Sequence, residues 1–534
     1  MQRLRLPLAT ALIGAAALAQ NPGAAGNDVE SLRRSLDEVR AAQEKLAAEN
    51  RALRDEVTTL KATRSESDAA AAEAQVDREV NALSGRMAGL EVKSAASALT
   101  LTGEFRFRTV TAFAGAGNGA VELDGYWTDA RVRTGFKYDF SKDVSAFTEF
   151  QSHWAFGDGA STNNSFGSPF SAGNYAVGSG DTTTDVDLYQ AYVDLKNVFN
   201  CSNLKYRVGR QEIVLGNQFQ FGNADWYSGW SFDGMRMDYD GESFALTALT
   251  FKGGTGDRDI NQFHSVAGAH DDDEMYGLYA TYKGAKNLTV DGYWFYMNGH
   301  GGANSGATFG GSGTSIGSLG NSVGGGGLAN GSTAYFHTLG ARVAGKIEGV
   351  ADGLDFNLEG AFQTGDVNGA GAVTDVNGFA FEGEIGLMFD AAHLFRLYTR
   401  FLWSEGPDGD ESGYVMLYPS RHGQGNFLAR YGTLDVLPMS NVITPQVGVT
   451  YAPNNDWILG AQVMWATADQ GSVLGGVSDD YGWEADLWAL YKVSENFTMV
   501  GALIFLFPDD EGTALFLVDD DVTVAIALQA RLAF

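Results

Sequence analysis

From Thr100 to the C-terminus, apolar and polar side chains alternate with a period of two in one segment after another. Residues 101–108 read Leu-Thr-Gly-Glu-Phe-Arg-Phe-Arg, and residues 130–138, 354–363, 395–403 and 522–534 repeat the pattern. Segments of about 10 residues that are apolar on one face and polar on the other are typical of transmembrane β-strands. A soluble, secreted all-β protein shows the same alternation of apolar and polar residues. The lengths of the connections between the segments are therefore needed to distinguish it from a transmembrane barrel.

Short and long connections follow one another along this region. Short ones lie at 141–143, 240–242, 283–287, 390–393, 453–456 and 494–496. Long ones lie near 112–128, 152–184, 211–230, 252–274, 297–334, 364–378, 404–441, 466–480 and 508–521. Outer-membrane barrels have short periplasmic turns and long external loops. We therefore predict an all-β fold, a transmembrane antiparallel β-barrel of about 18 strands over residues 100–534.

The N-terminus has the three parts of a secretory signal at residues 1–19. Arg3 and Arg5 precede an apolar stretch, and Ala17-Leu18-Ala19 forms a small-residue cleavage site. Export agrees with the single cysteine, Cys201, which excludes an intramolecular disulfide framework. This cysteine is either incidental or paired with another molecule.

Residues 28–95 are predicted to form a coiled coil. Over residues 29–60, unbroken heptads place mostly apolar residues at alternating spacings of three and four. Their a positions are Val29, Leu36, Gln43, Asn50 and Val57, and their d positions are Leu32, Val39, Leu46, Leu53 and Leu60. Such a seam predicts a homo-oligomer, either dimer or trimer. An even strand count puts both barrel ends on one side, so we expect a periplasmic stalk below an outer-membrane barrel.

The formal net charge of −30 excludes a nucleic-acid partner, which needs a basic face. Acidic runs fall in the predicted external loops at 271–274, 408–411, 479–480, 509–511 and 519–521. They are expected to form a solvated acidic rim. The alternative interpretation is that loop-bound Ca²⁺ or Mg²⁺ bridges these carboxylates to the phosphates of neighbouring outer-membrane lipid, since carboxylates suit these ions. We expect no other cofactor or metal.

The inward face of the predicted barrel carries charge of both signs, which predicts a polar bore with a basic wall and acidic walls. Its basic positions are Arg106, Arg108, Arg131, Arg133, Arg207, Arg236, Arg342, Arg396, Arg400 and Arg531. Its acidic positions are Asp355, Glu359, Glu382, Glu384, Glu484 and Asp486. Such linings tune solute choice. Arg–carboxylate pairs that brace neighbouring strands are an equally good interpretation of any one residue.

Catalysis is not expected. A hydrolytic site would need a positioned Ser–His pair, and Ser420 with His422 is the nearest approach. The Gly-rich stretch at 299–331 lacks the Gly-Lys-Ser/Thr ending of a phosphate loop. It is predicted to be an external loop, and whether it folds inward to narrow the bore is left open.

One stretch resembles the alginate-export family of outer-membrane barrels. Its motif residues are Gly209, Arg210, Gln211, Trp226, Phe232, Asp233 and Gly234, and the same segment includes Asp225, Met235 and Arg236. The resemblance implies an eighteen-stranded, porin-like barrel that passes polysaccharide or other hydrophilic solutes without energy input. It also implies a strongly basic conduit, to which Arg210 and Arg236 would contribute. The acidic inward positions depart from that pattern.

Two functions remain in competition. The first is a passive channel for hydrophilic solutes, with export of an anionic polysaccharide as one form of it. The second is a structural, stalked barrel that links the outer membrane to the cell wall, with transport incidental. Neither the direction of transport nor the preference for anions or cations follows from the sequence.

Overall fold

The computed structural model describes the chain from β1 onward with gaps in several connections. Described are residues 99–113, 125–157, 186–223, 225, 229, 231–253, 273–300, 333–369, 372–390, 392–406, 408, 411–420, 422, 430–433, 437, 439–470, 479–509 and 522–534. Single residues between Asp37 and Asp55 are also described, and they are helical and exposed. The signal peptide and the a and d positions of the heptads lie outside the described residues. The predicted stalk therefore remains a prediction.

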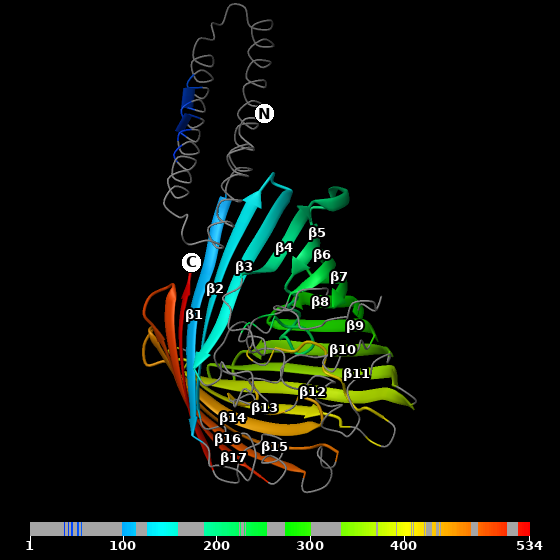
Figure 1. The fold of residues 1–534 in the computed structure, drawn as a ribbon, viewed down its shortest axis with the longest axis vertical. Coiled ribbons are helices and arrows are strands. Elements are labelled where there is room, and N and C mark those ends of the chain that lie inside the picture. Colours follow the sequence, from blue (N-terminus) through cyan, green and yellow to red (C-terminus); the bar gives the residue numbers. More distant parts are fainter. Residues whose placement is uncertain are drawn as a thin grey trace, which may run out of the picture. The chain divides into compact units, whose positions relative to one another are not determined.

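Eighteen strands follow one another around a closed antiparallel β-barrel, and β1 pairs with β18 to close it (Figure 1). The strands are β1 (Leu99–Phe113), β2 (Gly125–Asp139), β3 (Val144–Gly157), β4 (Asp187–Lys196), β5 (Leu204–Gln211), β6 (Phe232–Asp240), β7 (Phe244–Gly253), β8 (Asp273–Ala285), β9 (Leu288–His300), β10 (Thr333–Ile347), β11 (Gly353–Gly369), β12 (Ala372–Asp390), β13 (Phe395–Ser404), β14 (Val442–Tyr451), β15 (Trp457–Thr467), β16 (Asp480–Lys492), β17 (Phe497–Pro508) and β18 (Thr523–Ala533). A 3₁₀ turn, η2 (Val198–Asn200), precedes Cys201, a free cysteine. Among the described residues, no helix is long and apolar enough to cross a membrane.

The seam of the barrel is fully paired. Glu104 lies opposite Ala533 in the register of β1 and β18, and the pairing continues to Phe113 opposite Val524. Phe534 extends it, because its amide donates to the Gly103 carbonyl at 2.9 Å and the Gly103 amide donates back at 2.7 Å. Closure removes the unpaired strand edges that an open sheet would expose.

The alternation of the sequence separates the two faces of the wall. In β1, Phe105 and Phe107 are 42% and 37% exposed, whereas Arg106 and Arg108 between them are only 2% and 1% exposed. Apolar side chains therefore cover the outside and charged ones lie inside. This arrangement is the inverse of that in a soluble protein, and it is expected where the outer face contacts lipid and the interior is polar.

The predicted alternation of short and long connections is confirmed, with one correction. The long connection predicted at 364–378 is wrong, because β11 and β12 pair throughout from Gly353 opposite Met388 to Gly369 opposite Ala372. The Gly, Asn and Asp residues there indicate a loop, but the backbone still forms a ladder with its partner strands. At Gly365, an added Cβ would lie 2.0 Å from the Tyr335 carbonyl oxygen, so glycine allows β10 to approach.

Two long connections contribute to the interior. We call residues 212–231, between β5 and β6, the first inner loop, and residues 405–441, between β13 and β14, the second inner loop. Buried apolar residues of both belong to one core with inward-facing wall residues such as Phe295 and Phe336. This core positions the polar groups described next.

Candidate functional site

The first inner loop packs against the wall through aromatic rings. Phe221 is fully buried, with its ring centroid 4.8 Å from that of Phe295 on β9. The ring centroid of Tyr418, in the second inner loop, lies 4.9 Å from that of Phe232 at the start of β6. Buried aromatic pairs of this geometry contribute more than their area alone. This side of the loops is thus held by an apolar core.

The two inner loops are joined to each other by backbone hydrogen bonds. The Gly222 amide donates to the Tyr418 carbonyl at 2.8 Å, and the Tyr418 amide donates to the Gln220 carbonyl at 2.9 Å. Phe221 and Tyr418 form a parallel bridge at the centre of this pairing. We refer to the described residues of the two paired loops as the plug.

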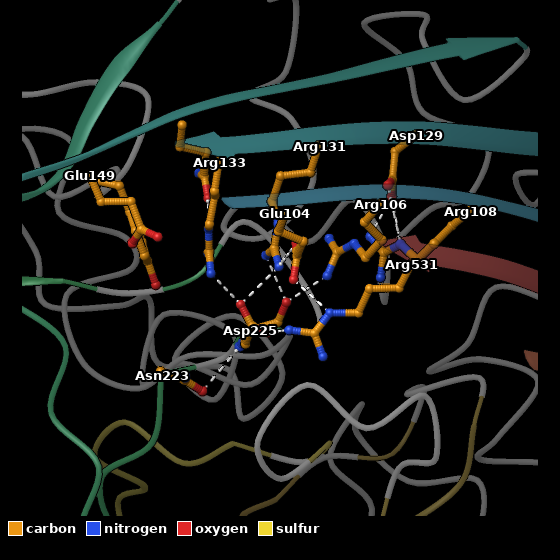
Figure 2. A network of polar contacts seen from close by, with 12 residues as sticks. Glu104, Arg106, Arg108, Asp129, Arg131, Arg133, Glu149, Asn223, Asp225 and Arg531 are labelled. Atoms are coloured by element: carbon orange, nitrogen blue, oxygen red, sulfur yellow. Dashed lines mark hydrogen bonds and ion pairs between the residues drawn. The ribbon is translucent and has the colours of Figure 1, made fainter. Parts of the chain in front are cut away.

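A basic wall faces the plug from β1, β2 and β18. It consists of Arg106, Arg108, Arg131, Arg133 and Arg531. Asp225 of the first inner loop lies among the guanidinium groups of four of them, Arg106, Arg131, Arg133 and Arg531, whereas Arg108 lies to one side with Asp129, as Figure 2 shows. Its carboxylate accepts from Arg131 at 2.9 Å and forms an ion pair with Arg133. The Asp225 carbonyl also accepts from Arg106 at 2.6 Å and from Arg131 at 2.8 Å.

The charge of Asp225 is set by its surroundings. Burial opposes its ionisation, but the positive charges of Arg131 and Arg133 outweigh burial and hold the pKa of Asp225 well below its usual range. Glu212, in the same loop, accepts from the Tyr189 hydroxyl at 2.5 Å, and burial raises the pKa of Glu212. Because of these two arginines, Asp225 stays ionised at neutral pH.

Glu104 and Asp129 complete the basic wall. Glu104 accepts from Arg131 at 2.9 and 2.5 Å and from Arg531 at 2.6 Å, so it connects β2 and β18 across β1. Asp129 accepts from the Arg108 Nε at 2.9 Å. Both carboxylates are buried, at 6% and 0% exposure. These two buried carboxylates thus hold Arg108, Arg131 and Arg531 on the wall.

The acidic wall on β12 and β16 receives the other end of the plug. Glu382 accepts from the Tyr431 hydroxyl at 2.6 Å and from Arg430 at 3.1 Å, and it also accepts from the Asn217 amide. On β16, Asp486 accepts from the Thr433 hydroxyl at 2.8 Å, while Glu484 accepts from the Thr433 amide. The plug therefore presents a carboxylate to the basic wall and a guanidinium to the acidic one.

A cavity of about 290 Å³ lies between the plug and the wall of β10–β13. Its polar lining consists of Asn217, Arg342, Asn357, Glu382, Glu384, Arg400, Arg430 and Tyr431. Guanidinium, carboxylate, amide and phenol groups therefore surround one water-accessible space. Such a mixed lining suits a hydrophilic solute and does not suit an apolar one.

Predicted lining residues outside the basic wall, including Arg342 and Arg400 of this cavity, form hydrogen bonds and ion pairs along the barrel wall. Arg207 donates to Asp194 at 2.7 Å, Arg236 to Asp238 at 2.7 Å, and Arg342 to Asn357 at 2.6 Å and to Asp291. Arg396 donates to Asp355 at 2.9 Å and to Glu384 at 2.6 Å, and Arg400 pairs with the same Glu384. Most of these pairs join different strands. These pairs brace neighbouring strands, and Arg342, Glu384 and Arg400 also line the cavity.

The motif residues lie on both faces of β5 and β6. Gly209 lies opposite Gly234 and Gln211 opposite the buried Phe232, next to the first inner loop. Arg210 lies opposite Asp233 and donates to it at 2.9 and 2.8 Å. Asp233 shares its face with Met235, which is 46% exposed, so Arg210 is on the outer face. The expectation that Arg210 adds charge to the conduit is therefore wrong, and Trp226 lies outside the described residues.

Several residues of this site were not predicted. Glu104 is two residues from Arg106, so the period-two pattern could have placed it on the same inward face. Asp225 stands in the segment that resembles the alginate-export family, but it is in a connection, where no periodic pattern indicates which way a side chain points. The acidic loop runs proposed to bind Ca²⁺ or Mg²⁺ lie largely outside the described residues. Within the described ranges, no group of three or more His, Cys, Asp or Glu side chains could hold a metal ion.

A family model described as "Alginate export" matches residues 127–469. The fold is similar to OccAB1 of Acinetobacter baumannii, with a TM-score of 0.52 at 12% identity, covering 83% of this chain and 98% of that chain. It is also similar to OccK2 (OpdF) of Pseudomonas aeruginosa, with a TM-score of 0.51 at 10% identity, covering 81% and 98%. No curated protein matches the sequence. The structural similarities support the barrel architecture.

Proposed function

Because the chain belongs to the alginate export family, we propose that its barrel passes hydrophilic solutes or polysaccharide across the outer membrane down their own gradient. The family and the fold are those of a β-barrel channel of this membrane. The observation that carries the proposal is the inverted barrel. Its outer face is apolar, and its interior holds buried ion pairs around a polar cavity of about 290 Å³.

The lining indicates how the solute is selected. Selectivity in such channels comes from bore width and from the charges on the wall. Here the inner loops narrow the interior, and each wall carries guanidinium groups balanced by carboxylates. We propose that the solute is polyhydroxylated and charged, and that an anionic polysaccharide is one member of this class. We propose no catalytic role for the chain.

Planar-bilayer recordings of the purified full-length chain test this function. We expect stepwise increases in conductance. We also expect a reversal potential in a salt gradient that shows a preference for anions or for cations. A preparation that folds, inserts and gives no conductance would sink the proposal.

We also propose that the heptads over residues 28–95 form a periplasmic stalk that brings copies of the chain together. Contact between this stalk and the cell wall is the structural alternative. Deleting residues 28–95 separates the two functions. Conductance of the purified barrel should persist if the chain is a channel, whereas envelope integrity should fail if the stalk is the main function.

A further inference from the structure

Four charged side chains lie on the outer face of β5–β8, where they cannot line the interior. They are Arg210, Asp233, Lys252 and Glu274, and we call them the charged row. Each lies directly opposite the next in the register of the sheet, so positive and negative charges alternate along the row. Each is also one residue from a strand end that leads into a long connection. Such connections are external in outer-membrane barrels, so the charged row lies near the external end of the wall.

The position of Lys252 makes it available to a further anion. Lys252 is on the same face of β7 as Phe244 and Leu246, which are exposed, and its own side chain is 50% exposed. Its ammonium group is 3.9 Å from the Glu274 carboxylate, which is longer than a hydrogen bond. Exposed ion pairs of this kind are weak, so the ammonium group can bind another anion at little cost.

Aromatic rings lie on the same outer face, next to the charged row. Tyr276 is two residues from Glu274, and its ring centroid is 6.3 Å from that of Tyr296. The ring centroid of His337 is 4.8 Å from that of Tyr296 and 5.9 Å from that of Trp294, and the Trp294 indole donates to His337 Nδ1 at 3.1 Å. We call Tyr276, Trp294, Tyr296 and His337 the aromatic cluster. The negative faces of such rings attract the polarised C–H bonds of a sugar.

Aliphatic side chains follow the aromatic cluster toward the middle of the wall. Met237, Leu278 and Leu339 are exposed, and they lie in the register that contains Trp294. From its external end, the outer surface of β5–β10 therefore presents charges, then flat rings, then hydrocarbon. A glycolipid with a phosphorylated sugar headgroup presents phosphate, sugar ring and acyl chains in the same order.

We infer that the charged row and the aromatic cluster bind a phosphorylated glycolipid of the outer leaflet. Lys252 donates to a phosphate, since an ammonium group is a common phosphate ligand. The partly exposed carboxylates of Asp233 and Glu274 accept from sugar hydroxyls, and the aromatic cluster contacts the sugar ring. Arg210 holds Asp233 in place through hydrogen bonds of 2.9 and 2.8 Å. This site is on the outside of the barrel and is independent of the proposed channel function.

Titration of the purified full-length chain in detergent micelles with lipid A, a disaccharide lipid with two phosphates, tests the site. Native mass spectrometry counts the bound lipid and gives its dissociation constant. We expect one tightly bound lipid A per chain. Lys252→Gln should weaken its binding about tenfold, the effect of losing one hydrogen bond to a charged group. Lys286→Gln is the matched control and should bind as the wild type does, because Lys286 also pairs with a glutamate but lies at a short turn.

Two other lipids separate the parts of the headgroup. Dephosphorylated lipid A should bind the wild type more weakly, and Lys252→Gln should bind it as the wild type does, since the phosphate is missing. Trp294→Leu should weaken the binding of both forms of lipid A by the same factor. Phosphatidylglycerol, which has a phosphate and no sugar ring, should bind more weakly than lipid A.

Equal affinity of the wild type and Lys252→Gln for lipid A would overturn the site. Equal affinity of the wild type for lipid A and phosphatidylglycerol would overturn the glycolipid as its ligand. The comparison of lipid A with its dephosphorylated form needs only the wild-type chain, so the inference stays testable if a variant fails to fold. Equal binding of these two forms would also overturn it.

Discussion

Replacing Glu104 by glutamine is expected to weaken the barrel at its seam. The Glu104 carboxylate is 6% exposed and accepts three hydrogen bonds, two from Arg131 at 2.9 and 2.5 Å and one from Arg531 at 2.6 Å. Glutamine keeps one acceptor oxygen and turns an NH₂ group toward a guanidinium. Removing one partner of a buried ion pair costs about 3–5 kcal/mol. We expect a loss of that order in the free energy of unfolding.

Urea unfolding of the purified barrel in detergent micelles, followed by tryptophan fluorescence, measures this loss. Glu348→Gln is the matched control, since Glu348 forms an exposed ion pair with Lys286 at a short turn. Exposed pairs of this kind contribute little, so its midpoint should stay near that of the wild type. Equal midpoints for Glu104→Gln and Glu348→Gln would show that the buried carboxylate does not brace β18, β1 and β2.

Two further predictions concern the motif and Asp225. Gly209→Ala should greatly reduce the yield of folded barrel in a heat-modifiability gel, because φ at Gly209 is +123° and an added Cβ would lie 2.2 Å from the Ala191 carbonyl oxygen. That backbone strain alone costs about 1–3 kcal/mol, whereas Gly292→Ala, whose Cβ meets nothing within 4 Å, should fold normally. Arg131 and Arg133 outweigh burial and keep the pKa of Asp225 well below its usual range, so the stability that ionised Asp225 contributes is complete above that range and is lost only as the pH falls through the lowered pKa. The difference in urea midpoint between the wild type and Asp225→Asn should therefore be the same at pH 7 and near pH 5, and a difference that disappears in that interval would contradict the reasoning.

Much of the wall could be predicted from the sequence, because a strand that faces lipid on one side must alternate. The faces of Phe105 and Arg106 follow from their spacing alone. The hairpin of β11 and β12 could not be predicted in the same way. Its glycines at 365 and 369 are typical of a loop, but the neighbouring strands supply the hydrogen bonds that keep this backbone extended.

The candidate site could be predicted only in part. Its inward arginines follow from the alternation, but their roles do not. Arg342 and Arg400 are braces because Asp291 and Glu384 lie on adjacent strands at the matching level. Which residues lie opposite each other depends on the register between strands. The pattern of side chains within one strand does not encode that register.

The sequence by itself determined the barrel, the two faces of its wall and the order of short and long connections, since these depend on local periodicity. Only the tertiary structure decided what fills the barrel. Asp225 meets Arg131 across 94 residues of chain, and Arg430 meets Glu382 across 48. Such contacts form because the closed barrel places side chains of one charge side by side on its inner wall. The two inner loops place side chains of the opposite charge against them. No periodic pattern in a connection specifies that path.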